Sequence, residues 1–350
     1  MKTVAAVQTE LGGTLGLEEV ELLDPAPDQV TVKLFSSGVC HSQLHQMHNA
    51  ALGRPLLLGH EGTGVVSRIG SNVDHVKEGD HCIVTWVPRT PVRGPVARTT
   101  TGAMFQGQAA HGHVYTWARD VQTNKELVVP IPQEHPRDLS CIIGCAVLTG
   151  AGAVIHTAGV RPGESVAVFG VGGVGLSAIR AASILDAYPV IAVDLDNDKL
   201  EFAKSFGATH VVNASGNADP VEAIRDLTGG GVDYAFDAIG KQITCEQILL
   251  ATRPGGIGAD NFGGMAVLVG IPQEKLTIDP SLFVYGQRQY RGSLGAAFPD
   301  RDFAMYLRWH QDGRFPLDRL ITRRYALEEI NQACDDLHDG KIMGRAILEY

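Results

Sequence analysis

The chain has 350 residues, a formal net charge of −10, 44% hydrophobic residues and 41 glycines. This length predicts about two domains, and the composition excludes a disordered, collagen-like or coiled-coil chain. The negative charge argues against binding to nucleic acid or to an anionic membrane surface. We expect no signal peptide and no membrane-spanning segment. The six cysteines are then reduced thiols or metal ligands of a cytoplasmic protein.

The first 146 residues contain short β-like runs separated by turn residues. The clearest runs are 30–35, 64–69 and 81–86, and glycine, proline, asparagine and aspartate lie between them. This pattern predicts an antiparallel, β-rich domain.

From residue 147 onward, apolar strands alternate with amphipathic helices. The predicted strands are 166–169, 190–193, 211–212, 232–236 and 266–269, and the predicted helices are 176–185, 196–206, 220–228 and 243–251. Such alternation predicts an α/β fold, a doubly wound parallel sheet with helices on both faces. From about residue 293 the pattern loosens, until a helix at 327–337 and a short strand at 346–348.

A glycine-rich loop follows the first strand of the α/β segment. Gly170, Gly172 and Gly175 fit the pattern G-x-G-x-x-G, in which the glycines allow a tight turn, approach of a pyrophosphate and close helix packing. Asp194 ends the next strand, where a carboxylate can bind an adenosine ribose and repel a 2′-phosphate. The pattern predicts binding of NAD in preference to NADP. The alternative is that the glycines serve packing and that Asp194 caps the following helix.

Two cysteines and a histidine form a second candidate site. Cys40, His60 and Cys145 are each ordinary when taken alone, because a single cysteine is usually a small buried hydrophobe. Two thiolates and one imidazole, however, make a three-ligand zinc site with an open fourth position. Chemistry therefore gives a reason to group them, although the spacing alone does not.

These motifs occur in the order found in a known family. Residues 38–45, 56–66, 79–80, 142–150, 170–175 and 344–345 carry the similarity. The sequence resembles the zinc-dependent alcohol dehydrogenases of the medium-chain dehydrogenase/reductase superfamily. The resemblance implies a GroES-like catalytic domain over 1–146 and 295–350, and a Rossmann NAD-binding domain over 147–294. It also implies a homo-oligomer, either a dimer or a tetramer.

The resemblance assigns roles to individual residues. Cys40, His60 and Cys145 would bind one catalytic zinc ion, with Glu61 beside the metal. Ser42 would receive the proton of the alcohol and His45 would release it, while Trp86 would line the substrate pocket. The residues implied to contact NAD are His41, Thr149, Gly170, Gly172, Gly173, Val174, Gly175, Asp194, Lys199 and Arg345.

Two features depart from the family pattern. No cysteine lies between Cys82 and Cys141, so the four-cysteine structural zinc site of many members cannot form. Gln43 stands where many members have an aspartate, and we expect its amide oxygen to accept the hydrogen bond of the zinc-binding histidine.

A basic segment lies where those members have the structural zinc. One hypothesis is that its arginines favour an anionic carbonyl substrate, and the alternative is a solvated loop or a subunit contact; the residues are Arg89, Arg93, Arg98 and Arg119.

The resulting hypothesis is an NAD-dependent zinc alcohol dehydrogenase. It would transfer a hydride between a small alcohol, or its aldehyde or ketone, and NAD(H). One alternative is a zinc-free NAD(P)H reductase of an activated double bond, and another is a non-catalytic cofactor-binding paralogue. The complete set of zinc ligands argues against both alternatives.

Overall fold

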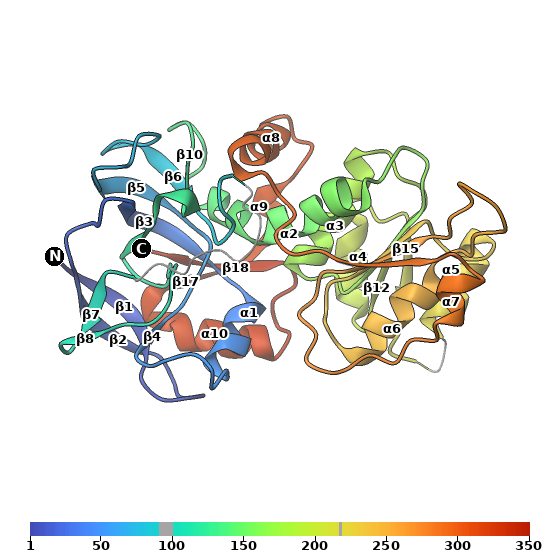
Figure 1. Cartoon of the computed structure of the whole chain (residues 1–350), viewed down its shortest axis with the longest axis horizontal. Helices are drawn as coiled ribbons and strands as arrows, with labels where there is room; N and C mark the ends of the chain where they lie inside the picture. The colour runs from blue at the N-terminus through green and yellow to red at the C-terminus, as the bar shows by residue number, and fades with distance from the viewer. Residues whose placement is uncertain (91–100, 217–218) are drawn as a thin grey trace. The chain divides into compact units, whose positions relative to one another are not determined.

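The computed structural model describes residues 1–90, 101–216 and 219–350. Two compact units make up the chain (Figure 1): unit 1 comprises Met1–Cys145 and Phe298–Tyr350, and unit 2 comprises Ala146–Ala297. Among the described residues, every helix is too short or too polar to cross a lipid bilayer.

The described residues of unit 1 form two sheets. The first has the strand order β4 (Leu56–Leu57), β1 (Lys2–Gln8), β2 (Gly16–Leu22), β7 (Ala103–Phe105) and β8 (Gln108–Ala109). The second has the order β10 (Val128–Pro130), β6 (His81–Val84), β5 (Gly62–Ile69), β3 (Gln29–Val39), β18 (Arg345–Glu349) and β17 (Ile321–Ala326), with β9 (Asp120–Asn124) also on β3. Most of these pairs are antiparallel, so the predicted β-rich domain is confirmed.

Strand β3 is the centre of unit 1. It pairs with β5, β9 and β18, and nearly all of its side chains are buried. Because β18 lies close to the C-terminus, the chain returns to unit 1 after unit 2 and completes this sheet.

Short helices surround the sheets of unit 1. They are η1 (Lys125–Leu127), α1 (His41–Met47), η2 (Leu139–Gly144), α9 (Leu317–Leu320), η4 (Leu327–Glu329) and α10 (Ile330–His338). A longer helix, α8 (Pro299–Gln311), falls where the sequence pattern loosened and was not predicted. Its apolar positions Phe303, Tyr306 and Leu307 are buried on one face, and the buried Asp302 accepts a hydrogen bond from the Phe298 amide at 2.8 Å.

Unit 2 contains a parallel sheet. Its order is β13 (His210–Asn213), β12 (Val190–Asp194), β11 (Val166–Phe169), β14 (Tyr234–Asp237), β15 (Met265–Leu268) and β16 (Gln289–Gly292), and every pair is parallel. The helices are α2 (Ala146–Gly152), η3 (Ala153–Ala158), α3 (Gly173–Ile184), α4 (Asn197–Lys204), α5 (Pro220–Thr228), α6 (Gln242–Ala251) and α7 (Ser281–Val284). Helices α3 and α6 lie on opposite sides of the sheet (Figure 1). The predicted doubly wound α/β fold is confirmed.

The order of the strands in unit 2 indicates where a ligand would be expected to bind. The chain proceeds from β11 outward through β12 and β13, and then returns to the other side of β11 as β14. Ligands of open α/β sheets bind at the carboxyl ends of the strands where the order reverses. The glycine loop directly follows β11 and therefore lies at this point.

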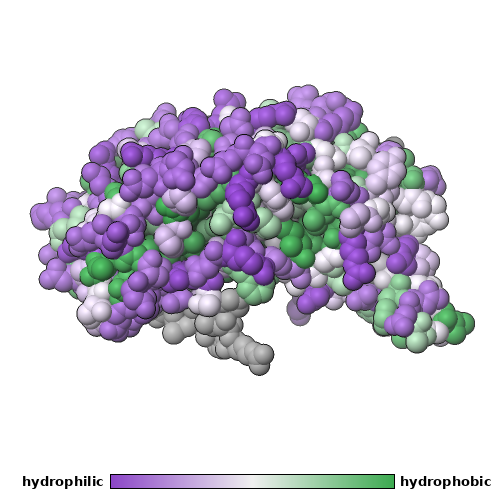
Figure 2. All heavy atoms as spheres, turned by 90° about the horizontal axis from the view of Figure 1, so that it is seen from above, coloured by the Kyte–Doolittle hydropathy of each residue, from purple (hydrophilic) through white to green (hydrophobic). Residues whose placement is uncertain are grey.

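The surface of the chain is mainly hydrophilic on the face seen in Figure 2, with apolar side chains in smaller areas. Among the described residues, most of the exposed large apolar side chains belong to unit 2. They include Ile257, Tyr285 and Leu294, the last two with exposed fractions of 83% and 85%.

An added methyl group should affect the stability of the chain differently at two glycines of the loop. A Cβ on Gly175 would lie 1.8 Å from the Gly170 carbonyl oxygen, whereas a Cβ on Gly172 would meet no atom within 4 Å. We expect Gly175→Ala to lower the free energy of unfolding by about 1–3 kcal/mol or more, because the overpacked helix must shift. Gly172→Ala should leave it nearly unchanged. Urea unfolding of the two variants tests this, and equal losses would contradict it.

Candidate active site

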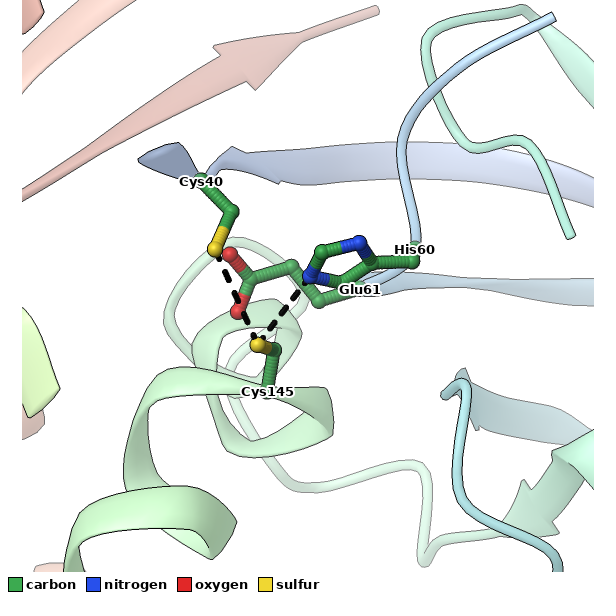
Figure 3. Close-up of side chains that lie close together, drawn as sticks. All are labelled: Cys40, His60, Glu61 and Cys145. Carbon is green, nitrogen blue, oxygen red and sulfur yellow. Dashed lines mark hydrogen bonds between the residues drawn. The ribbon is translucent and has the colours of Figure 1, made fainter. Parts of the chain in front are cut away.

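Four potential metal ligands meet in unit 1. Cys40 directly follows β3, His60 and Glu61 precede β5, and Cys145 follows η2. All four residues are buried, and their ligand atoms lie within 4.8 Å of one another (Figure 3). The sheet and η2 thus bring together residues that are far apart in the sequence.

Hydrogen bonds link these side chains. The sulfur atoms of Cys40 and Cys145 are 3.9 Å apart, and Nε2 of His60 lies 3.1 Å from the Cys145 sulfur. The hydrogen bond from the Cys145 thiol holds the pKa of Cys40 well below its ordinary value, with help from the positive charge of Arg345 and from the neighbouring His60. The same bond, together with burial, raises the pKa of Cys145. In the metal-free chain, Cys40 is therefore the cysteine that loses its proton, and Cys145 keeps its own.

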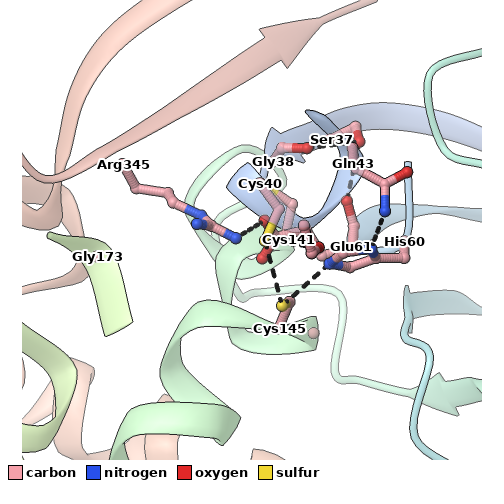
Figure 4. Close-up of polar contacts among 12 residues, drawn as sticks. Ser37, Gly38, Cys40, Gln43, His60, Glu61, Cys141, Cys145, Gly173 and Arg345 are labelled. Atoms are coloured by element: carbon pink, nitrogen blue, oxygen red, sulfur yellow. Dashed lines mark hydrogen bonds and ion pairs between the residues drawn. The ribbon is translucent and has the colours of Figure 1, made fainter. Parts of the chain in front are cut away.

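A buried ion pair adjoins the four ligands. Strand β18 pairs with β3 so that Ala346 lies opposite Val39, which places Arg345 beside Cys40. The guanidinium Nη2 of Arg345 donates to the Glu61 carboxylate, and both side chains are buried (Figure 4). Burial opposes the charge of Arg345, but the negative Cys40 and Glu61 hold its pKa well above the ordinary value.

Arg345 has a partner that the sequence did not indicate. The resemblance implies a contact with the cofactor pyrophosphate, and in the structure the guanidinium pairs with Glu61. Opposite charges at positions 61 and 345 were visible in the sequence. The pairing of β18 with β3, which brings them together, was not.

The donor set suits a zinc ion. Thiolates and imidazoles are the ligands that Zn²⁺ prefers, and two cysteines with one histidine leave a coordination position open. Cys40, His60 and Cys145 therefore fit the chemistry of a catalytic zinc site, and Glu61 offers an oxygen atom beside them.

Gln43 contacts this cluster in an unexpected orientation. Its Nε2 faces Nδ1 of His60, while its Oε1 accepts a hydrogen bond from the Gly59 amide at 2.5 Å. The expectation that the amide oxygen faces the histidine is therefore wrong, because the backbone N–H of Gly59 occupies that oxygen.

The other residues assigned to catalysis lie close to the cluster. Ser42, in the first turn of α1, donates from its hydroxyl to the Cys40 sulfur at 3.2 Å. His45 lies one turn further along α1, and its ring centroid is 5.4 Å from that of His41. The hydrogen bonds of the described residues include none between Ser42 and His45. The ring of Trp86 packs edge-on to His60 with centroids 6.3 Å apart.

The glycine loop and Asp194 form a second candidate site, in unit 2. The Asp194 carboxylate accepts hydrogen bonds from the Val171 amide in the loop, at 2.9 Å, and from the Leu195 amide, at 2.8 Å. Gly172 is exposed and open, and Gly173 and Val174 begin α3. Asp196, rather than Asp194, caps α4 and bonds the amide of Lys199.

One buried hydroxyl of unit 2 lacks a partner. Oγ1 of Thr149, on α2, makes no hydrogen bond with any described residue. A buried hydroxyl without a partner loses the hydrogen bonds that it makes in water. A ligand that bound here and formed a hydrogen bond with the Thr149 hydroxyl would be stabilised by that bond. The resemblance assigned Thr149 to the cofactor.

The basic segment is only partly described. Arg89 forms a bidentate ion pair with Asp300 of α8, at 2.8 and 2.9 Å, and Arg119 lies 3.4 Å from Glu328. Arg93 and Arg98 fall outside the described residues. The contact of Arg89 favours a structural role for this arginine over substrate recognition.

Comparisons with known proteins match almost the whole chain. Residues 26–133 match the family model for the alcohol dehydrogenase GroES-like domain, and residues 173–312 match that for zinc-binding dehydrogenase. An alcohol dehydrogenase zinc-binding domain protein from Burkholderia ambifaria is 32% identical, with a TM-score of 0.90 and coverage of 100% of this chain and 99% of that one.

Two further solved structures are similar. Benzyl alcohol dehydrogenase from Acinetobacter calcoaceticus is 29% identical, with a TM-score of 0.88 over 100% of this chain and 99% of that one. A protein from Sinorhizobium meliloti 1021 bound to NADP is 24% identical, with a TM-score of 0.81 over 100% of both chains. This last likeness concerns the fold alone.

The buried ion pair gives a stability prediction for the zinc-free chain. Arg345→Met should lower the free energy of unfolding by roughly 3–5 kcal/mol, because it leaves the Glu61 carboxylate buried without its cation. Arg324→Met is the matched control, since Arg324 is 41% exposed and pairs with Asp138 at the surface. The control should lose at most about 1 kcal/mol. If urea unfolding showed equal losses of unfolding free energy in the two variants, burial of the Glu61–Arg345 pair would not increase its contribution to stability.

Proposed function

Since the chain belongs to the zinc-binding alcohol dehydrogenases of the medium-chain dehydrogenase/reductase superfamily, and is thus an oxidoreductase, we propose that it is an NAD-dependent zinc alcohol dehydrogenase. It interconverts a small alcohol and the corresponding aldehyde or ketone. The observation that carries the proposal is the buried cluster of Cys40, His60, Glu61 and Cys145, whose ligand atoms lie within 4.8 Å of one another.

In this proposal the cysteines and His60 hold one zinc ion. A bound zinc ion would act as a Lewis acid that lowers the pKa of a hydroxyl and polarises a carbonyl. The low pKa of Cys40 supports its role, because only a thiolate is a good metal ligand. Arg345 holds Glu61 in place and offsets part of the negative charge of the ligand set.

Ser42 and His45 would carry the proton that an alcohol loses. The contact of the Ser42 hydroxyl with the Cys40 sulfur supports this role, because it places the hydroxyl next to a metal ligand. His45 is half-buried on the same helix, and its imidazole can both accept and donate a proton, so it is proposed to exchange that proton with solvent.

Unit 2 would hold the dinucleotide. The open space at Gly172 leaves room for a pyrophosphate at the N-terminus of α3, where amide groups and the helix dipole favour an anion. Asp194 would bind the adenosine ribose, with Lys199 nearby, and the hydroxyl of Thr149 would contact the cofactor. His41 is proposed to contact the pyrophosphate.

The substrate is proposed to be a primary or secondary alcohol. Trp86 supplies an aromatic wall beside His60, which suits the apolar part of an alcohol. A relative 29% identical to this chain is named for benzyl alcohol, so an aromatic alcohol is the first substrate to assay.

We also propose that the chain forms a homo-oligomer in the cytoplasm. Among the described residues, strand β16 pairs only with β15, and Tyr285 and Leu294 near it are largely exposed. Unpaired sheet edges and exposed apolar side chains are typical of subunit contacts. The absence of disulfides among the six cysteines fits a reducing compartment.

The metal content tests the central part of this proposal. Protein purified without added metal should contain one zinc ion per chain by elemental analysis, because no cysteine lies between Cys82 and Cys141, where the four-cysteine structural site would be. Chelation should abolish oxidation of benzyl alcohol by NAD while the far-ultraviolet circular dichroism stays unchanged. Two tightly held zinc ions, or activity without any metal, would contradict the proposal, and the second result would favour a zinc-free reductase.

The cofactor preference tests the role of Asp194. We expect kcat/KM to be at least about tenfold higher for NAD than for NADP, a difference of about 1.4 kcal/mol in transition-state stabilisation. The carboxylate of Asp194 would repel the 2′-phosphate of NADP. Asp194→Asn should narrow the ratio, because it removes the charge but keeps a hydrogen-bond acceptor. An NADP preference of the unaltered chain would refute the assignment.

A further inference from the structure

The amide of Gln43 is fixed between two partners. Gln43 is only 1% exposed, and its Oε1 accepts the hydrogen bond of the Gly59 amide at 2.5 Å. Its Nε2 lies against Nδ1 of His60 (Figure 4). A backbone N–H can only donate, so the amide oxygen must face Gly59 and the NH₂ group must face the histidine. Gly59 itself has a φ of +93°, and a Cβ there would lie 2.6 Å from the Trp117 amide nitrogen, so this backbone segment is closely confined.

This arrangement determines which nitrogen of His60 carries the proton. The Gln43 NH₂ group is a donor, so Nδ1 must be the acceptor and carry no hydrogen. The proton of the neutral imidazole is then on Nε2, which lies 3.1 Å from the Cys145 sulfur and can donate to it. Without metal, all of these polar groups are satisfied.

Metal binding conflicts with this hydrogen-bond arrangement. A zinc ion on Nε2 takes the place of the proton, and a neutral imidazole then carries its proton on Nδ1. That N–H would face the NH₂ group of Gln43, donor against donor. Turning the amide would satisfy His60 but would direct the NH₂ group at the N–H of Gly59. A carboxylate of the same length would accept hydrogen bonds from both.

We infer that Gln43 is a positioning residue that opposes metal binding at His60. With this amide, the chain binds zinc more weakly, and exchanges it more readily, than it would with a carboxylate at position 43. The inference rests on the proposed zinc site. It assigns this role to an amide whose two ends are fixed by Gly59 and His60, and not to any of the metal ligands.

Three substitutions in the full chain test the inference. Gln43→Glu should lower the zinc dissociation constant by about 10- to 100-fold, the usual effect of a residue that supports a metal ligand. Gln43→Leu cannot donate to Nδ1 and should bind zinc at least as tightly as the unaltered chain. If Gln43 merely held the ring in place, Gln43→Leu would bind zinc more weakly. Gln46→Glu adds the same charge to α1 without contacting His60 in the structure, and it should change little.

Zinc affinity is measured by competition with a chelator of known affinity. In parallel, ¹⁵N NMR of histidine-labelled, zinc-free protein reads the proton position on His60, assigned with a His60→Gln variant. We expect the proton on Nε2 in the unaltered chain and a shift toward Nδ1 in Gln43→Glu, a change that a purely structural role would not produce. Unchanged affinity in Gln43→Glu, or a proton on Nδ1 in the unaltered chain, would overturn the inference alone. Absence of zinc binding in every variant would refute the proposed metal site as well.

Discussion

The concentration of acidic groups inside unit 1 is the constraint on which the candidate site depends. Two thiols and a carboxylate share a buried volume in which their ligand atoms lie within 4.8 Å of each other. Burial disfavours each negative charge, and mutual repulsion disfavours them further. One hydrogen bond between the cysteines and one guanidinium, that of Arg345, offset this cost. The negative groups of the site are therefore stabilised by positive charge. Arg345 supplies part of that charge, and a bound divalent cation would supply more.

The part of this positive charge that the protein supplies comes from the C-terminal segment of unit 1. Strand β18 completes the second sheet beside β3, and its register delivers the guanidinium of Arg345 to Glu61. The same β3 ends at Cys40 and continues into α1, which carries Gln43. One strand pair thus links the candidate metal ligands, the counter-charge of Arg345 and the amide of Gln43 that contacts His60. In the proposed function, unit 2 would bind the dinucleotide through the amides of its glycine loop and the carboxylate of Asp194.

The sequence predicted the regular elements better than the contacts between them. Strand 166–169 and helix 220–228 have the predicted bounds, since a buried apolar run and the Asp219–Pro220 start are local signals. Helix α8 was missed because its apolar positions are sparse, although Pro299 marks its start. The chemistry of two thiolates and an imidazole gave a reason to group the zinc ligands, and the family resemblance assigned their roles. The orientation of Gln43 could not be predicted, because it depends on the backbone N–H of Gly59, and no residue type reports where that group points.

The most direct measurement of the central claim is zinc K-edge X-ray absorption of the purified full chain. If Cys40, His60 and Cys145 hold the metal, the spectrum should show two sulfur atoms at about 2.3 Å and one imidazole nitrogen at about 2.0–2.1 Å, with the remaining coordination from light atoms. A shell of oxygen and nitrogen alone, or one of four sulfurs, would contradict the account.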